Sequence, residues 1–457
     1  VQYPIATFAA LRAGLVIVNT NPMYTPREMQ HQFTDSDAQA LIILDQIKPS
    51  LDPIRADVPL KHVIVTGAAD FVAGIPELAS GDVSLDQEGN YSLANILAHH
   101  QSTDYVANDA EQTDVAILQY TGGTTGVSKG AALSHRNAMA NFMQTAERAQ
   151  PTYKDCQEIL ICPLPLYHIY AFAMAMFFTC AHGNHTVLIP NPRDLDATVA
   201  AIKPYKFTIF AGLNTLFVGL CMHEGFKQLD FSALKITLSG GSALMDATAH
   251  MWHQTTGCPV SEGYGLSETS PVITLNDPTA PMIGTVGKPL VDTEVQLWND
   301  KDEPVADGEE GELVCRGPQV MLGYWNRPDE TAKVMKDGFF KTGDIAVRLP
   351  SGHIKIVDRL KDMIIVSGFN VFPNEIEGVL MTHPDVMEAA VIGEPDERTG
   401  EKVCAYLTSQ KTLDPAAIEA FCREQLTNYK IPKKIVQLDE LPKSSVGKIL
   451  RRELRSA

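Results

Sequence analysis

The chain is organised around residues 120–130, which read Tyr120-Thr121-Gly122-Gly123-Thr124-Thr125-Gly126-Val127-Ser128-Lys129-Gly130. The apolar run Val115-Ala116-Ile117-Leu118 comes just before this stretch and predicts a buried strand. A helix is predicted after the stretch, from Ser134 onward. Residues 120–130 are therefore predicted to contain a loop that follows a buried strand and precedes a helix.

The composition of this loop suits a polyphosphate ligand. Its glycines let the backbone bend back and approach a ligand closely. Its hydroxyl side chains and Lys129 add donors and a positive charge, so the loop could surround phosphates with N–H, O–H and ammonium groups. It is not a Walker A loop, because Gly130 follows Lys129 where Ser or Thr should stand. A Gly/Thr-rich surface turn is the simpler interpretation of the loop taken alone.

Two motifs further along the chain favour the ligand-binding interpretation. One reads Ser261-Glu262-Gly263-Tyr264-Gly265-Leu266-Ser267-Glu268-Thr269-Ser270, and the other reads Leu441-Pro442-Lys443-Ser444-Ser445-Val446-Gly447-Lys448-Ile449-Leu450-Arg451-Arg452. With the loop, they resemble the adenylate-forming superfamily, which includes acyl-CoA synthetases, luciferases and peptide-synthetase adenylation domains. The matching patterns are G-Y-G-x-[ST]-E and P-K-[ST]-x-x-G-K, and the resemblance covers essentially all 457 residues. It is closest to the bacterial long-chain fatty-acid–CoA ligases.

The resemblance implies that ATP, Mg²⁺ and coenzyme A are used. The residues it assigns to the phosphates of ATP are Thr121, Gly122, Gly123, Thr124, Thr125, Gly126 and Lys129. Mg²⁺ is expected on Thr121 and Glu268, because this hard cation favours a carboxylate together with phosphate oxygens. An isolated glutamate would otherwise be read as surface charge.

The nucleoside is expected beside the second motif. By resemblance, Tyr264 stacks on adenine, Ser267 contacts the α-phosphate, and an ionised Asp344 accepts hydrogen bonds from both ribose hydroxyls. The other residues implied to bind the nucleotide are Gly241, Ser242, Glu262, Gly263, Gly265 and Arg359. Gly241 and Ser242 follow a predicted strand at the edge where open α/β sheets bind ligands, although a plain turn also explains them.

The acyl substrate is expected beside His168 and Tyr170, with Gly241 and Gly265 leaving room for it. No acidic residue lies between positions 164 and 181, which argues against an amino-acid substrate, because peptide-synthetase domains usually hold an Asp there. Acetate-specific relatives carry a Trp where Gly265 stands, so a short acid is disfavoured. The aromatic, Met and Ala residues after His168 suit an apolar tunnel, and a plain core helix explains them equally.

The C-terminal quarter resembles the mobile part of the superfamily. Arg359 and Lys361 lie in a run that the resemblance identifies as a hinge, and a charged β-turn is the simpler interpretation. Ser367 and Gly368 would lie along the pantetheine tunnel of coenzyme A. Lys448 is predicted to be the catalytic lysine, although a basic tail is usually solvated. The predicted catalytic residues are Lys448, Thr121, Glu268 and His168.

Alternating strand-like and helix-like patches predict an α/β fold with parallel or mixed sheets flanked by helices. The chain is too long for a single core. We expect a large AMP-binding domain at 1–357 with a β-rich subdomain at about 284–357, a hinge at 358–361, and a small mobile α+β C-terminal domain at 362–457. The chain begins at Val1 and not at Met, so a leading segment is expected before it.

Bulk properties limit the partners. The 37 basic and 55 acidic residues give a net charge of −18, which argues against a nucleic-acid binder. The eight cysteines show no C-x-x-C pair and no metal-ligand spacing, which predicts reduced thiols in the cytoplasm. The longest apolar stretch, 170–181, is shorter than the roughly 17–25 residues that span a bilayer. Peripheral contact with the inner face of a membrane and a homodimer stay open.

The expected reaction is ATP-dependent conversion of a long-chain fatty acid to acyl-AMP, followed by transfer to coenzyme A. The products would be acyl-CoA, AMP and pyrophosphate. Three alternatives remain at this point. They are an aryl- or other acyl-CoA ligase of the same fold, an acid-activating enzyme that loads a carrier protein, and an inactive fragment.

Overall fold

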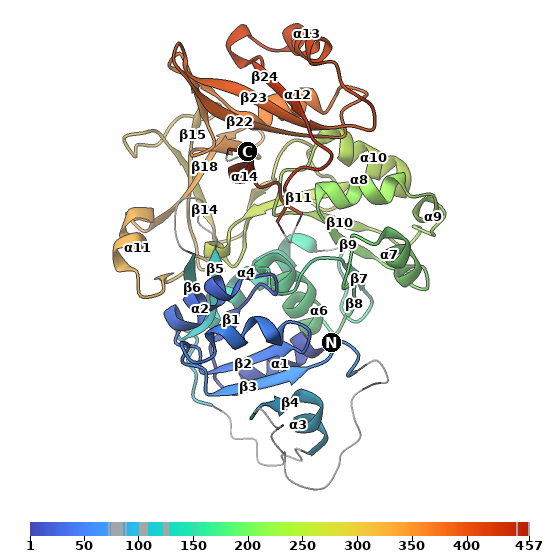
Figure 1. Cartoon of the computed structure of the whole chain (residues 1–457), viewed down its shortest axis with the longest axis vertical. Coiled ribbons are helices and arrows are strands. Elements are labelled where there is room, and N and C mark those ends of the chain that lie inside the picture. Colours follow the sequence, from blue (N-terminus) through green and yellow to red (C-terminus); the bar gives the residue numbers. More distant parts are fainter. Residues whose placement is uncertain are drawn as a thin grey trace.

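The structure is a computed structural model that describes residues 1–71, 74, 86, 89–99, 108–121, 128–150, 152–444 and 447–455. Within these residues the strands form five sheets. In Figure 1 the N-terminal elements, in blue, lie at the bottom of an elongated molecule, and the C-terminal elements, in red, lie at the top. The predicted α/β fold, with a large N-terminal part and a small α+β C-terminal part, is confirmed.

The loop in residues 120–130 joins the two strands of an antiparallel hairpin. Strand β5 (Val115–Thr121) pairs antiparallel with β6 (Lys129–Ser134), and Thr121 lies opposite Lys129. The predicted buried strand is confirmed, since the central residues of β5 are buried. The sequence interpretation missed β6, whose apolar centre is too short to stand out. Residues Gly122 to Gly126 lie outside the described residues.

The hairpin is extended on both sides by short strands from distant parts of the chain. Strand β1 (Ile17–Asn19) runs parallel to β5, and β16 (Gly323–Tyr324) runs antiparallel to β6. Helix α4 (His135–Ala149) follows β6, and its first turn is capped by the Ser134 hydroxyl, which accepts a hydrogen bond from the Asn137 N–H. The predicted helix start at Ser134 is therefore confirmed.

A second, mostly parallel sheet forms the middle of the molecule. Its strands lie in the order β13-β12-β11-β10-β9-β7-β8, and β11, β10, β9, β7 and β8 are parallel. Their bounds are β7 Ile159–Cys162, β8 His185–Leu188, β9 Ile209–Gly212, β10 Ile236–Ser239, β11 Val260–Gly265, β12 Val272–Leu275 and β13 Lys288–Pro289. Gly241 follows the carboxyl end of β10, and Tyr264 lies at the carboxyl end of β11.

A small parallel sheet near the N-terminus differs from its prediction. It contains β2 (Ala40–Leu44), β3 (His62–Thr66) and β4 (Tyr91–Ser92). The apolar run in β2 predicts a buried strand, but Ile42 and Leu44 are exposed. This expectation is wrong because β2 lies at the edge of the sheet order and only one of its faces packs on a described core.

The predicted β-rich stretch near residues 284–357 is also present. Strands β14, β15, β18 and β17 lie side by side, and β19 pairs with β18. Their bounds are β14 Glu294–Trp298, β15 Glu310–Arg316, β17 Met335–Lys336, β18 Phe339–Arg348 and β19 Ile354–Arg359. Strand β16 leaves this group and joins the hairpin sheet, which brings the β-rich stretch to the loop at residues 120–130.

The C-terminal sheet has its own buried clusters. Strands β21, β20, β23 and β22 lie in that order, and β24 pairs with β23. Their bounds are β20 Ile364–Val366, β21 Phe369–Val371, β22 Glu388–Asp396, β23 Gly400–Thr408 and β24 Lys434–Gln437. The sequence patterns at 386–392 and 403–407 predict strands and the one at 415–426 predicts a helix, and all three are confirmed within a few residues.

The helices flank these sheets. The α-helices are α1 Gln2–Arg12, α2 Pro26–Asp35, α3 Leu93–His99, α5 Ile169–Ala171, α6 Thr179–Ala181, α7 Leu195–Ile202, α8 Asn214–Met222, α9 Glu224–Lys227, α10 Asp246–Thr256, α11 Pro328–Val334, α12 Pro373–Leu380, α13 Pro415–Gln425 and α14 Arg451–Leu454. Single 3₁₀ turns are η1 Lys48–Ser50, η2 Asp52–Ile54, η4 Ser267–Thr269 and η5 Asn428–Lys430, and η3 Phe172–Phe178 is a π-helix. No helix in the described stretches is both long and apolar enough to cross a membrane.

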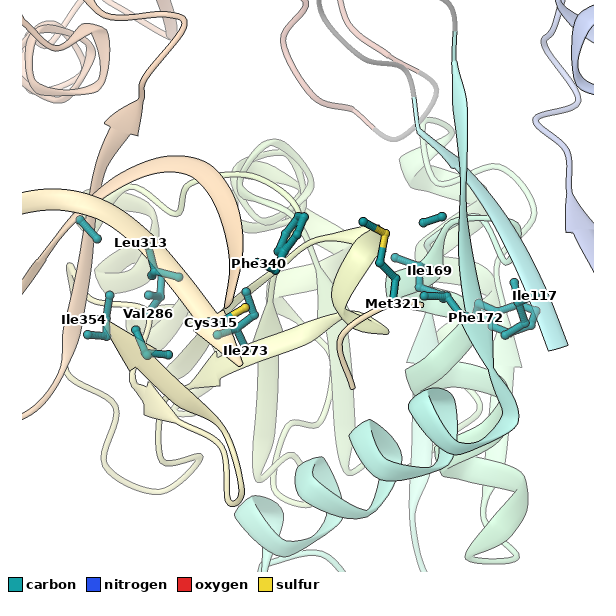
Figure 2. Close-up of a cluster of buried hydrophobic side chains, with 14 of the residues drawn as sticks. Ile117, Ile169, Phe172, Ile273, Val286, Leu313, Cys315, Met321, Phe340 and Ile354 are labelled. Carbon is teal, nitrogen blue, oxygen red and sulfur yellow. The ribbon is translucent and has the colours of Figure 1, made fainter. Parts of the chain in front are cut away.

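One buried cluster joins the hairpin to the β-rich sheet. It contains Ile117 from β5, Phe172 from the π-helix and Ile273 from β12, with Leu313 and Ile354 from the β-rich strands (Figure 2). Because these five side chains pack in a single core, the strand that leads into the loop cannot shift independently of the β-rich sheet. The core thus holds β5, which leads into the loop at residues 120–130, together with the β-rich sheet.

Trp252 is the largest fully buried side chain of α10 and supplies a test of the middle layer. Its ring lies 4.7 Å from that of Phe217 and 5.0 Å from that of Phe210 between centroids. We expect Trp252→Ala to lower the free energy of unfolding by about 3–5 kcal/mol, measured by denaturant titration. Met222→Ala, at an exposed site on α8, should change it by no more than about 0.5 kcal/mol. Equal losses in the two variants would contradict the packing described here.

Candidate active site

The candidate site lies where the hairpin, the carboxyl ends of β10 and β11, the β-rich sheet and the C-terminal tail meet. Thr121 ends β5 and Lys129 begins β6. Glu268 lies in η4, which packs against both of these strands. The prediction that Gly122, Gly123, Thr124, Thr125 and Gly126 hold phosphate falls outside the described residues. The two ends of that loop are nevertheless fixed by the hairpin.

Lys129 has two neighbours that the sequence did not predict. Its ammonium lies 2.8 Å from Glu330 Oε2 and 4.5 Å from the centre of the Tyr324 ring. Tyr324 belongs to β16 and Glu330 to α11, about two hundred positions away in sequence, and the pairing of Tyr324 with Ala131 brings both elements to Lys129. Lys129 is therefore held in place by an anion and an aromatic face.

Glu268 is buried, and its carboxylate accepts a hydrogen bond of 2.9 Å from the Tyr324 hydroxyl. Burial raises the pKa of Glu268, and the hydrogen bond from Tyr324 and the charge of Lys129 oppose that rise. A buried carboxylate with so few protein donors has lone pairs free for another partner. With the Thr121 hydroxyl it offers the oxygen donors that Mg²⁺ favours when phosphate completes the set, so these residues fit the metal.

Tyr264 and Arg359 both contact Asp344. The Tyr264 hydroxyl donates a hydrogen bond of 2.5 Å to Asp344 Oδ2, and Arg359 Nε lies 3.7 Å from Oδ1. The antiparallel pairing of β18 with β19 places Asp344 directly opposite Arg359. Burial, followed by the charge of Asp344, raises the pKa of Tyr264, which stays a neutral donor. The three predicted nucleoside residues thus form one connected group.

Glu262 lies deeper than its neighbours in the motif. It is buried, and its carboxyl accepts a hydrogen bond of 3.0 Å from the Leu244 N–H. Burial raises the pKa of Glu262 to about 8, so the carboxyl is mostly protonated at neutral pH. A neutral carboxyl can donate as well as accept, which suits a hydrogen bond to a base more than a contact with phosphate.

The glycines of the motif are required by the backbone. A Cβ at Gly265 would lie 1.8 Å from the Pro271 carbonyl oxygen, and one at Gly263 would lie 3.0 Å from the Leu275 side chain. Gly241 has a φ of +81°, in the left-handed region that glycine adopts most easily. Because any side chain at 265 would clash, Gly265 alone carries no information about the acyl pocket. That part of the specificity argument stays a prediction.

His168 and Tyr170 lie at the start of the helix that contains the π-helical turn. The His168 ring accepts a hydrogen bond of 3.4 Å at Nδ1 from the Tyr170 N–H, which leaves Nε2 to carry the proton. Burial, assisted by Lys448, lowers the pKa of His168 to about 4, so the ring is neutral. The Tyr170 hydroxyl donates to the Leu238 carbonyl, and its ring packs near Gly240.

The residues after Tyr170 are packed in the core. Phe172 and Met176 belong to the cluster in Figure 2, and Met174 and Phe178 belong to the cluster against β9 and β10. The π-helix from Phe172 to Phe178 widens the turn, a form of helix that is rare and often occurs at functional sites. An acyl tunnel along this helix stays a prediction.

The C-terminal tail brings Lys448 into the site. A Cβ on the neighbouring Gly447 would lie 3.4 Å from Thr215 Oγ1 and 3.6 Å from Leu213 Cδ1, so the tail touches the start of α8. Burial, followed by the charge of Arg359, lowers the pKa of Lys448 to about 7, while Asp344 opposes that shift. The charge of Lys448 also lowers the pKa of His168, so the two side chains are near enough to interact electrostatically.

Arg451, three residues beyond Lys448, was missed by the sequence interpretation. Its guanidinium lies 2.7 Å from Glu377 Oε2 and 3.6 Å from Asp358 Oδ1, and it donates to the Asn374 side chain. Asp358 also accepts a hydrogen bond of 2.8 Å from the Asn374 N–H. This Arg451 cluster ties the tail to Asp358, in the strand β19 that runs into the proposed hinge.

The other predicted C-terminal residues differ in their positions. Lys361 lies close enough to Lys448 and Asp344 to share their electrostatics, and burial followed by Arg359 lowers its pKa to about 8. Ser367 and Gly368 form the turn between β20 and β21, where the Ser367 N–H donates to Thr399 and a Cβ at 368 would meet open space. The described contacts of Ser367 and Gly368 are thus within their own sheet.

The sequence matches the AMP-binding enzyme family over residues 1–325 and the AMP-binding enzyme C-terminal domain over residues 375–448. The chain belongs to the AMP-binding enzymes. It is 44% identical to a long-chain-fatty-acid–CoA ligase of Salmonella typhimurium over 472 residues, which cover 99% of this chain and 83% of that protein. It is 34% identical to a protein of the same name from Bacillus subtilis, again over 99% of this chain and 83% of the relative.

Solved AMP-binding enzymes share the fold. An anthranilate CoA ligase in complex with anthranoyl-AMP aligns with a TM-score of 0.87 at 26% identity, covering 99% of this chain and 84% of that one. ATP-bound MatB from Rhodopseudomonas palustris aligns with a TM-score of 0.86 at 28% identity, covering 99% and 86%. Use of ATP, Mg²⁺ and coenzyme A follows from membership of the family.

In this AMP-binding enzyme, docking of the tail is expected to depend on pH. The pKa of Lys448 is lowered from 10.5 to about 7 in the docked tail, so docking releases a proton. Docking therefore weakens as the pH falls from about 10 towards 7 and changes little below that, with Lys361 acting in the same sense. In nucleotide-free enzyme, hydrogen exchange of residues 447–455, corrected for intrinsic rates, should slow as the pH rises through this range. Lys448→Met should remove most of the dependence, and an unchanged dependence would contradict the desolvation of the Lys448 ammonium in the docked tail.

Proposed function

We propose that this chain is a long-chain-fatty-acid–CoA ligase that forms acyl-AMP from a fatty acid and ATP and then transfers the acyl group to coenzyme A. The observation that carries the proposal is the connected group of Tyr264, Asp344 and Arg359, and it is supported by Lys448, whose pKa the charges of Arg359 and Asp344 shift and whose own charge lowers the pKa of His168. Such a lysine would face the carboxylate and the α-phosphate at once. The similarity to several ligases of that name supports the choice of acid.

In the first step, a carboxylate oxygen attacks the α-phosphorus of ATP. The new acyl C–O–P linkage forms as the bond to the bridging oxygen of pyrophosphate breaks, and pyrophosphate leaves. Lys448 stabilises the charge that develops between the carboxylate and the α-phosphate. Thr121, Glu268 and Lys129 hold the phosphate side, where bound Mg²⁺ neutralises phosphate charge. Asp344 and Arg359 fix the ribose. The remaining nucleotide contacts come from Tyr264, Gly241, Ser242, Glu262, Gly263, Gly265 and Ser267.

His168 orients the acid without adding charge. Because its pKa is lowered to about 4, the ring stays neutral and can donate only a hydrogen bond from Nε2 to the carboxylate. A charged imidazolium would bind the carboxylate more tightly but would make it a weaker nucleophile. Tyr170 and Gly241 line the start of the acyl path.

In the second step, the thiolate of coenzyme A attacks the acyl carbon. The C–S bond forms while the C–O bond to AMP breaks, and the thiol proton passes to solvent. We propose that the chain has a large domain at 1–357, with a β-rich subdomain at about 284–357, and a C-terminal domain at 362–457. Between the two steps the C-terminal domain would turn and present a different face to the large domain. Rotation about the hinge at 358–361 would carry Lys448 away and bring Ser367 and Gly368 to the pantetheine arm.

The choice of a long acid is tested by product profiling. Each buried methylene contributes roughly 0.8 kcal/mol, so a long chain gains binding, while one methylene discriminates by only about 1–3 kcal/mol. With acids of graded length, acyl-CoA formation should favour medium to long chains over a broad range. A sharp preference for acetate or for an aromatic acid would contradict the proposal.

We also propose that the enzyme is cytoplasmic, works peripherally at the inner face of the membrane, where its acid partitions, and assembles as a homodimer. Co-sedimentation with phospholipid vesicles tests the membrane contact, and light scattering on a sizing column tests the homodimer. No binding to vesicles with or without added fatty acid, or a monomeric mass at all concentrations, would contradict them separately.

A further inference from the structure

Lys129, the lysine assigned to the phosphates of ATP, already forms an ion pair with a carboxylate of this chain, that of Glu330. Lys129 Nζ lies 2.8 Å from Glu330 Oε2, and the two side chains are only partly exposed, at 25% and 34%. The same Glu330 also pairs with Lys333 one turn along α11. Lys129 and then Lys333 lower the pKa of Glu330 to about 2, so it carries a full negative charge at any working pH.

The pairing is built into the fold. Strand β16 lies beside β6, and the Trp325 N–H donates to the Gly130 carbonyl at 2.7 Å, next to Lys129. Helix α11 begins at Pro328, which puts Glu330 in its first turn, where a negative charge is favoured. The position of Glu330 is therefore set by backbone pairing and a helix start rather than by the lysine alone.

We propose that Glu330 is an affinity-setting residue: it competes with the β- and γ-phosphates of ATP for Lys129 and is displaced when the nucleotide binds. The proposal rests on the function given above, because it takes Lys129 as a phosphate contact. The centre of the Tyr324 ring lies 4.5 Å from the Lys129 ammonium, and this contact can stay in place when phosphate replaces Glu330 as the partner of Lys129. Lys333 remains as a partner for the displaced carboxylate.

The competition makes a directional prediction. Breaking a partly exposed ion pair changes a binding constant by about two- to five-fold. Glu330→Gln keeps the size of the side chain and removes its charge, so it should tighten binding of a Mg²⁺-bound non-hydrolysable ATP analogue by that factor. AMP lacks the β- and γ-phosphates, so its affinity should not change. Both dissociation constants are measured by calorimetry without acid or coenzyme A.

Asp329→Asn is the matched control, because Asp329 is exposed and carries the same charge one residue away. If the effect of Glu330→Gln came only from the overall field, Asp329→Asn would tighten the analogue equally and AMP would gain too. Either result would overturn the proposal. The specific contact predicts a clearly smaller change for Asp329→Asn.

A double-mutant cycle separates this proposal from the function on which it rests. In a Lys129→Gln background, Glu330→Gln should have no effect on the affinity for the analogue, because the pair is already broken. If Lys129→Gln weakens the analogue but Glu330→Gln leaves it unchanged, Glu330 is a surface partner only and the proposal fails. If Lys129→Gln itself changes nothing, the phosphate site assigned to Lys129 is wrong. Thermal melting of each variant confirms that it is folded.

Discussion

Lys448→Ala is expected to reduce acid-dependent exchange of pyrophosphate into ATP by about 10²–10³-fold, because the charge that forms between carboxylate and α-phosphate loses its nearest cation. Thioester formation from presynthesised acyl-AMP should stay close to normal. Lys448 is half-buried in the docked tail, where the charges of Arg359 and Asp344 act on its pKa, so we expect its removal to act on the first step. The two half-reactions are measured separately, with radiolabelled pyrophosphate and with purified acyl-AMP plus coenzyme A.

Lys443→Ala provides the control for the tail. Lys443 lies five residues before Lys448 and pairs with Glu388 at 2.8 Å, within the C-terminal sheet and away from the nucleotide group. Its loss should leave pyrophosphate exchange within about two-fold, as expected for the loss of one ion pair near the surface. If Lys448→Ala slowed both half-reactions equally, Lys448 would not be specific to the first.

The second large effect is expected from Glu268→Gln. The substitution keeps the shape and the hydrogen bond from Tyr324 but removes the charge that would hold Mg²⁺. Adenylate formation should fall by about 10²–10³-fold, and the Mg²⁺ concentration for half-maximal rate should rise. Initial rates across a Mg²⁺ titration measure both quantities.

Glu310→Gln, at the exposed start of β15, removes an equal charge outside the site. Its rate and Mg²⁺ dependence should match those of the unmodified enzyme. A Glu268→Gln enzyme with normal Mg²⁺ dependence would show that the metal is held elsewhere.

The motifs allowed most of the central site to be anticipated. Tyr264, Asp344 and Arg359 meet in the structure because one strand pair and one motif turn place them, and each lies in a run whose local pattern is distinctive. Strands such as β5 and helices such as α2, with its cap at Thr25, are equally visible in the sequence because their signals are local.

The supporting residues could not be anticipated in the same way. Tyr324 and Glu330 reach Glu268 and Lys129 only because β16 pairs with β6, a contact between segments about two hundred positions apart. Arg451 sits in a basic tail that resembles a solvated one until Glu377 and Asp358 surround it. Side-chain partners of this kind depend on strand order, and no local pattern encodes strand order.

The burial of a strand could not be predicted where it depends on the position of that strand in its sheet. Strand β2 is as apolar as β3, yet Ile42 and Leu44 face outward because β2 lies at the end of its sheet. The Pro271 carbonyl lies 1.8 Å from the position of a Cβ at Gly265, so in this backbone the glycine is required whatever the acyl pocket holds. Its link to the acyl pocket stays a prediction.

The Arg451 cluster has a consequence for movement of the tail. Glu377, Asn374 and Asp362 all follow the proposed hinge, so they would turn together with Arg451 as one rigid unit. At the proposed hinge, the described contacts of this unit are with Asp358, through Arg451 and the Asn374 backbone, and with the Val357 carbonyl, which accepts a hydrogen bond of 3.2 Å from the Asn374 side chain. Swinging the C-terminal lobe would then release the Asp358 carboxylate and the Val357 carbonyl and leave the ion pairs of Arg451 with Glu377 and Asp362 intact.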